Sequence, residues 1–130
     1  MTEAALIFTA LLFGGMTLFS FGFASFVLNA LPADTARLLI RRAFPHFYLF
    51  VLLTAAAACG IAALPDPVSA GFLAFIAATT LYARQILMPA INRATDAGNA
   101  SRFKWLHGGS VALTLLHIVM AGISLVRLGS

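Results

Sequence analysis

An uncharged run of thirty residues, Ala4–Ala33, opens the chain and reads AALIFTALLFGGMTLFSFGFASFVLNALPA. A helix needs about 20 predominantly apolar residues to cross the hydrocarbon core of a bilayer. The run is longer than this, and it follows the acidic Met1-Thr2-Glu3 rather than the positive residues that open a signal peptide. It therefore predicts a retained transmembrane helix.

Three further apolar runs follow, each bounded by polar residues or prolines. None alternates polar and apolar positions as a membrane barrel strand does, and only helices and closed barrels can satisfy their backbone groups in lipid. We expect an all-α fold, a single-domain integral membrane four-helix bundle. Its four transmembrane spans are predicted at about 4–30, 43–64, 68–90 and 105–126.

The composition excludes several classes of protein. The chain has 130 residues, of which 62% are hydrophobic and 9% charged, whereas a soluble domain carries about 25% charged residues. A soluble enzyme, a disordered tail and a nucleic-acid-binding module are therefore excluded. The lipid bilayer is the expected partner, and so small a bundle favours a homo-oligomer or a place in a larger membrane complex.

Short polar connections separate the predicted spans. Asp34 is expected to cap a short helix that leads into the second span. Asp66 is the expected N-cap of the third span, with Pro67 at the first helical position, where its missing N–H matters least. Ser101 is the expected cap of the fourth.

The basic residues are distributed unequally between the two ends of the predicted bundle. Seven of the eight lie in or beside the first and third connections, and Arg127 alone lies at the other end. Because cytoplasmic connections carry an excess of Lys and Arg, we expect both termini to be periplasmic and the protein to lie in the cell inner membrane. The seven are Arg37, Arg41, Arg42, Arg84, Arg93, Arg102 and Lys104.

Few ionisable groups remain within the spans, and such groups are functional candidates because charge is costly in lipid. No Asp or Glu lies inside a predicted span, which disfavours a carboxylate-based pump or metal site. His46 and His107 share a depth near the cytoplasmic boundary, and His117 lies about 15 Å deeper on the fourth helix. Arg84 either clamps an anion or extends its side chain to the headgroups.

Three interpretations of the histidines stay open. They could be axial ligands of haem b or ligands of a transition metal. They could move protons or gate a small permeant species. They could instead bond to neighbouring helices and stabilise the bundle. On the fourth helix, the face expected to point inward carries Ser110, Thr114, His117, Ala121 and Ser124.

Three stretches resemble a known family. They are residues 26–48 (FVLNALPADTARLLIRRAFPHFY), 81–89 (LYARQILMP) and 103–110 (FKWLHGGS). Together they are similar to the transmembrane-protein-205-like family, a domain of unknown function (4149). The resemblance implies a small four-helix membrane domain of a family for which no general biochemical activity is established. It also implies that the family pattern falls on Asn29, Pro32, Pro45, Arg84, Pro89, His107, Gly108 and Ser110, and not on His46 or His117.

These residues suggest a polar cluster near the cytoplasmic side. Asn29 ends the first span there, Arg84 ends the third, and His107 begins the fourth, close to Ser110. We expect a non-enzymatic membrane domain that binds or passes a small ligand, ion or metal at this cluster. The alternative is a haem-b-binding or redox protein that uses His46, His107 or His117 as axial ligands.

Overall fold

A computed structural model describes residues 2–130, and 92% of the chain is helical. No strand occurs in that part of the chain. A π-helical segment interrupts two of the four long helices. Such segments appear mostly as single-turn bulges inside α-helices. The elements are α1 (Thr2–Thr17), η1 (Leu18–Phe23), α2 (Ala24–Ala30), α3 (Ala33–Ala62), α4 (Pro67–Tyr82), η2 (Ala83–Leu87), α5 (Met88–Asp96) and α6 (Ala100–Gly129).

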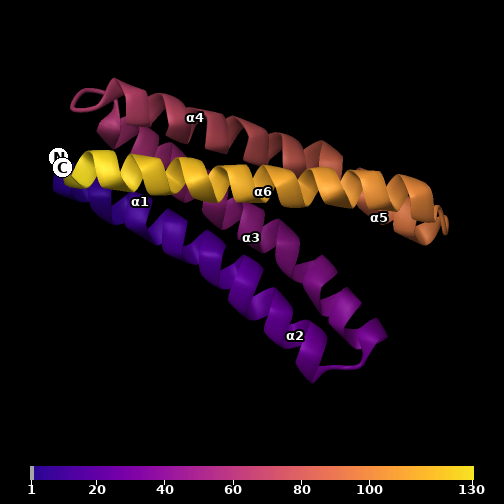
Figure 1. The fold of residues 1–130 in the computed structure, drawn as a ribbon. Coiled ribbons are helices and arrows are strands. Elements are labelled where there is room, and N and C mark those ends of the chain that lie inside the picture. The colour runs from indigo at the N-terminus through magenta and orange to yellow at the C-terminus, as the bar shows by residue number, and fades with distance from the viewer. Residues whose placement is uncertain (1) are drawn as a thin grey trace.

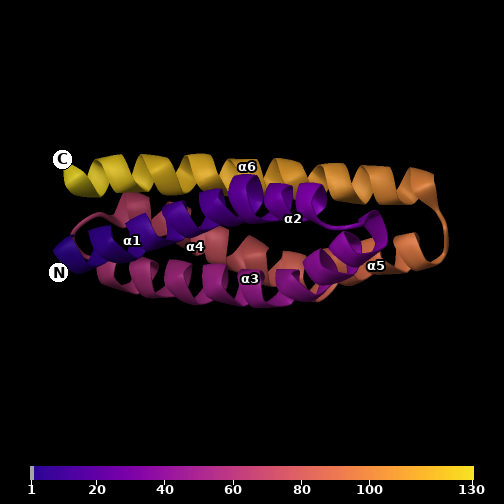
Figure 2. The same cartoon turned by 90° about the horizontal axis from the view of Figure 1, so that it is seen from below.

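The four long helices run antiparallel in chain order and form a closed ring. α1 packs on α3, α3 on α4, α4 on α6, and α6 returns to α1. Figure 1 shows both termini at one end of the bundle, beside the α3–α4 turn, and Figure 2 shows the same helices from below. The remaining two connections lie at the opposite end, which carries most of the basic residues and is called the basic end below.

The predicted fold class is confirmed: the protein is an all-α four-helix bundle whose helices are long and apolar enough to span a membrane. The four candidate spans have mean hydropathy between 1.3 and 2.0. Large apolar side chains cover the outside, such as Ile7, Phe26 and Val126, each more than 60% exposed. Such a surface fits a multi-pass membrane protein, because lipid covers it where water cannot.

The helices are longer than the predicted spans. α3 begins at Ala33 and continues without a break through Pro45 to Ala62, so the expected separate short helix after Asp34 does not exist. A 30-residue helix is about 45 Å long, against about 30 Å of hydrocarbon. The ends of the helices therefore project beyond the apolar layer, and the positions of its boundaries stay predictions.

The caps were predicted with mixed success. Asp66 is the N-cap of α4 as expected, accepts from the Ser69 backbone N–H, and is followed by Pro67. α6, however, begins two residues earlier than a Ser101 cap implies, because the side chain of Asn99 accepts from the Arg102 N–H. Ser101 is already inside that helix, so the prediction of a Ser101 cap is wrong.

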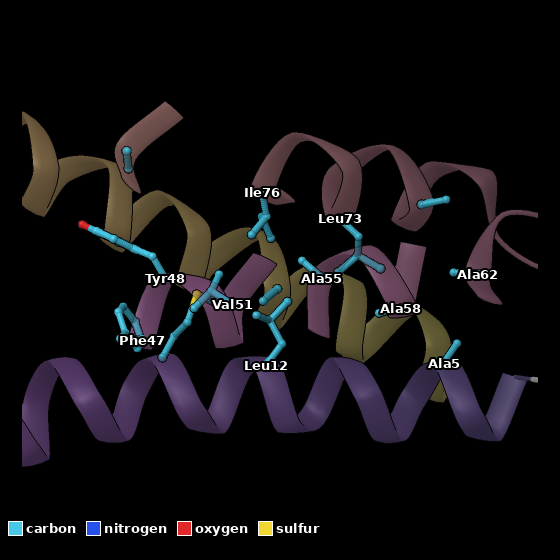
Figure 3. Packing of buried hydrophobic residues seen from close by; sticks show 14 of the residues in the cluster. Ala5, Leu12, Phe47, Tyr48, Val51, Ala55, Ala58, Ala62, Leu73 and Ile76 are labelled. Carbon is cyan, nitrogen blue, oxygen red and sulfur yellow. The ribbon is translucent and has the colours of Figure 1, made fainter. Parts of the chain in front are cut away.

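The core lies along the axis of the bundle and is built from small and medium side chains. Ala55, Ala58 and Ala62 are fully buried on α3, which lets α4 approach closely. Figure 3 shows Leu12 from α1 and Leu73 from α4 pointing toward this row. Packing of this kind leaves the helix-to-helix distance short and excludes a wide internal channel.

At the basic end the bundle opens on one side. α1 packs on α6, but α2 packs on η1 and α3, and Figure 1 shows α2 diverging from α6. Aromatic rings fill the inner side of this divergence, with Phe19 stacked on Phe47 at 4.0 Å between centroids. The groups predicted to form a site lie at or near this more open half of the bundle.

Candidate functional site

Arg84 is the one charged side chain of the predicted site. It lies in η2, is half-buried, and donates from Nε to the Pro45 carbonyl oxygen at 3.1 Å and from Nη1 to Gln85 Oε1 at 3.3 Å. No carboxylate within residues 2–130 forms an ion pair with it. Its guanidinium is therefore fixed against α3 and keeps donors for another acceptor.

Ser110 connects the site to the third helix. Its hydroxyl lies 3.4 Å from the Tyr48 hydroxyl, and α3 and α6 run in the same direction. This contact places residue 48 beside residue 110, so His46 and His107 lie at a similar depth, as predicted. Both imidazoles are exposed, and His107 stacks on Phe103 of its own helix with 5.2 Å between ring centroids.

Asn29 lies apart from the other predicted ligands. Its side chain is exposed and donates to the Ser25 carbonyl oxygen of its own helix at 2.8 Å. Phe19 lies beside Phe47, and Asn29 follows Phe19 by ten residues, or about 15 Å of helix toward the basic end. The structure therefore brings Arg84, His107 and Ser110 to one depth and leaves Asn29 outside it.

The inward face of α6 was predicted correctly. His117, Ala121 and Ser124 are buried, and Ser110 and Thr114 are half-buried. His117 is 5% exposed, and its Nε2 lies 2.6 Å from Thr79 Oγ1 on α4. This contact joins α6 to α4, so at least this histidine bonds to a neighbouring helix.

A small cavity lies beside His117. Its volume is about 10 Å³, and all four long helices contribute to its walls. Ligand pockets for organic molecules measure about 300–1,000 Å³, so the surroundings of His117 do not fit a haem. Among residues 2–130, no three His, Cys, Asp or Glu side chains are grouped so that they could hold a metal ion. The lining residues are Met16, Phe47, Tyr48, Val51, Thr80, Thr114 and His117.

Two threonines of α4 were missed by sequence reasoning. Thr79 binds His117, and Thr80 is 1% exposed with an Oγ1 that has no hydrogen-bond partner. The available signal was a Thr-Thr pair in an otherwise apolar span, opposite the predicted inward face of α6. A polar pair at that depth is best explained by polar groups on a facing helix.

At the opposite end of the bundle, an ion pair joins the end of α6 to the start of α4. Arg127 donates from Nη2 to Asp66 Oδ1 at 2.9 Å and from Nε to Oδ2 at 3.2 Å, and Ser69 Oγ donates to Oδ2 at 2.6 Å. The Arg127 guanidinium, followed by the Ser69 hydroxyl, holds the pKa of Asp66 well below its usual range. The single basic residue outside the basic end thus has a structural partner.

Comparison with known proteins yields a family and no relative of known activity. The family model described as a domain of unknown function, DUF4149, matches residues 7–100. No curated protein and no solved structure matches the chain. The matched range includes Asn29 and Arg84 but ends before His107, and it does not confirm the name transmembrane-protein-205-like. Because the match covers more than half of the sequence, the chain belongs to the DUF4149 family.

Proposed function

We propose that this protein is a non-enzymatic, multi-pass domain of the cell inner membrane that binds a phosphate-type anion at Arg84. The observation that carries the proposal is a half-buried guanidinium fixed in place without a carboxylate partner. A cation at membrane depth is costly unless it is paired. Its free donors and its planar fork match a phosphate or carboxylate group.

The depth of Arg84 suggests where the anion comes from. Arg84 follows Pro67, the first residue of α4, by 17 residues, or about 25 Å of helix. With about 30 Å of hydrocarbon, a boundary beside the Asp66–Arg127 ion pair would put Arg84 just inside the opposite boundary. Phospholipid phosphates lie just outside that boundary, where a long arginine side chain can reach them. Inorganic phosphate offers the same chemistry from the aqueous side.

Neighbouring groups extend this polar layer on α6. His107 and Ser110 lie near the depth of Pro45, the residue whose carbonyl accepts from Arg84. Neither forms a hydrogen bond with Arg84, so we assign them a supporting role on the adjacent helix. Asn29 is not needed for this proposal, since its amide is engaged within α2.

Binding agrees with the geometry better than passage does. The cavity next to this layer, lined in part by Tyr48 and His117, measures only about 10 Å³. Leu73 and Ile76 are fully buried in the core deeper along α4. A permeant ion would meet close-packed side chains, whereas an anion at Arg84 needs no path through the bundle.

The orientation follows from the charges. The basic end carries Arg42, Arg93, Arg102 and Lys104, which form no ion pair with a carboxylate of the described chain. The positive-inside rule assigns this end to the cytoplasm and both termini to the periplasm. The anion at Arg84 would then belong to the cytoplasmic leaflet or to the cytoplasm.

Lipid binding measured by native mass spectrometry tests the proposal. The protein is released from nanodiscs of phosphatidylcholine with or without phosphatidylglycerol. We expect retained phosphatidylglycerol, and we expect Arg84→Gln to weaken its binding by roughly tenfold, since hydrogen bonds to charged groups contribute about 1.5–3 kcal/mol. Inorganic phosphate that competes with the lipid would identify a general anion site.

Arg42→Gln is the matched control, because Arg42 is exposed at the same end and forms no ion pair. It should change lipid binding by less than about twofold, as expected for a screened surface charge. No retained lipid on the natural protein, or equal losses in the Arg84 and Arg42 variants, would contradict the proposal.

A further inference from the structure

Most threonine hydroxyls in this bundle form the same hydrogen bond within their own helix, and two do not. In Thr9, Thr17, Thr54, Thr79 and Thr95, Oγ1 donates to the carbonyl oxygen four residues earlier, at 2.7–3.0 Å. Thr2 and Thr35 lie in first helical turns, where that acceptor is lacking. The exceptions are Thr80 and Thr114, and both line the cavity beside His117.

Of the two, Thr80 has the stronger requirement for a hydrogen-bond partner. Its side chain is 1% exposed, and its Oγ1 has no hydrogen-bond partner within the described chain. A buried hydroxyl without a partner costs about 1–3 kcal/mol, and most such groups in folded proteins bind protein atoms or ordered water. Because the back-bond used by the other threonines is not formed, its hydroxyl is available to the cavity.

The hydrogen bonds of Thr79 indicate which nitrogen of the His117 ring carries the proton. The single hydrogen of Thr79 Oγ1 is directed to the Phe75 carbonyl oxygen at 2.7 Å, and a carbonyl can only accept. The 2.6 Å contact with His117 must therefore run from the Nε2–H to the Thr79 oxygen. In a neutral imidazole Nδ1 is then an acceptor, and it has no hydrogen-bond partner among residues 2–130.

The cavity has the volume for one occupant. A water molecule needs about 10–15 Å³ of such space and two to four polar partners, and this cavity offers about 10 Å³. Its walls provide a hydroxyl from Thr80, a hydroxyl from Thr114 and the His117 ring, with the Tyr48 side chain beside them. An organic molecule is too large, and the lining contains one His and no Cys, Asp or Glu, too few of these side chains to hold a metal ion.

We propose that one buried water molecule occupies this cavity, donates a hydrogen bond to His117 Nδ1 and accepts one from the Thr80 hydroxyl. The water joins α4 to α6 in the interior of the bundle, next to the direct bond between Thr79 and His117. This water site is separate from the anion site at Arg84, so an experiment can disprove one proposal without affecting the other.

Solid-state NMR of the labelled protein in phospholipid bilayers tests the proposal, through magnetisation transferred from water protons to side chains. We expect transfer to the Thr80 side chain and the His117 ring, and none to Thr9, which is equally buried but bonded to the Ala5 carbonyl. The His117 nitrogens should show a protonated Nε2 and an unprotonated Nδ1. Transfer to Thr80 and His117 no stronger than to Thr9 would overturn the proposal.

The second measurement is the direction in which Thr80→Val shifts the thermal midpoint. Thr80→Val keeps the shape and removes the hydroxyl. If water is present, Thr80→Val should lower the thermal midpoint and abolish the transfer to His117. Thr80→Ser keeps the hydroxyl and should leave the midpoint and the transfer unchanged. With a dry cavity, Thr80→Val removes an unpaired hydroxyl and should raise the midpoint, which would contradict the proposal. If Thr80→Val does not fold, the spectra of the natural protein still decide.

Discussion

His117 Nε2 and Thr79 Oγ1 lie 2.6 Å apart and form a direct polar link between α6 and α4 inside the apolar bundle. Hydrogen bonds between membrane helices have measured values near 1 kcal/mol, less than their apolar surroundings suggest, because unfolded helices in lipid also find partners.

We predict that Thr79 and His117 are energetically coupled. A double-mutant cycle with Thr79→Val and His117→Phe should give a coupling free energy of about 0.5–1.5 kcal/mol, measured by reversible unfolding in mixed micelles. Thr95→Val paired with His117→Phe is the control, since Thr95 bonds only to the Ile91 carbonyl. Additive effects of Thr79→Val and His117→Phe would show that the contact contributes nothing.

The second prediction concerns pH. The carboxyl of Asp66 has its pKa lowered by Arg127 and Ser69, so the folded state binds a proton less readily than the unfolded state does. The stabilisation is fully present above the unfolded value of about 3.9 and is lost as the pH falls below it. The thermal midpoint should be level from pH 7 to about 5 and then fall.

Asp66→Asn should lower the midpoint at pH 7 and flatten this decline. Asp34→Asn is the matched control, because Asp34 is exposed and lies 4.0 Å from its basic neighbour Arg37. If Asp66→Asn and Asp34→Asn gave the same acid profile, the ion pair with Arg127 would not be the cause.

Two adjacent glycines of α1 provide the third prediction. A Cβ added at Gly15 would lie 2.5 Å from Cε1 of Phe50, whereas one added at Gly14 meets nothing within 4 Å. Gly15→Ala should destabilise the bundle by about 1 kcal/mol, since overpacking costs about 1–3 kcal/mol and the helix preference of Ala returns up to about 1 kcal/mol.

Gly14→Ala should be neutral or slightly stabilising in the same unfolding assay. A Gly15→Ala variant as stable as Gly14→Ala would mean that the Phe50 ring moves aside without cost and that α1 and α3 are less closely packed than the structure shows.

The sequence predicted the fold well because lipid imposes a simple rule on it. Apolar runs long enough to cross a bilayer must be helices, and Asp66-Pro67 is a strong local start signal for one of them. The rule is weaker at helix ends. Pro45 lies within α3 without ending it, since prolines are tolerated inside membrane helices.

The candidate site was less predictable because it depends on rotation about helix axes and on the pairing of distant residues. The shared depth of His46 and His107 followed from residue counting. The displacement of Asn29 did not, since it depends on the stacking of Phe19 on Phe47. The Thr79–His117 bond and the Asp66–Arg127 pair join residues 38 and 61 positions apart, and no local pattern specifies such pairs.

Orientation in the membrane is the claim on which the Arg84 site depends, and cysteine labelling tests it directly. In a Cys59→Ala background, a single cysteine is introduced as Ala97→Cys in the connection at the basic end or as Ser130→Cys at the terminal end, both exposed. Intact cells are treated with a membrane-impermeant maleimide, and disrupted membranes serve as the control for reactivity.

We predict that Ser130→Cys reacts in intact cells and that Ala97→Cys reacts only after the membrane is disrupted. Labelling of Ala97→Cys from outside, with Ser130→Cys protected, would place the basic end in the periplasm and contradict an anion site on the cytoplasmic boundary.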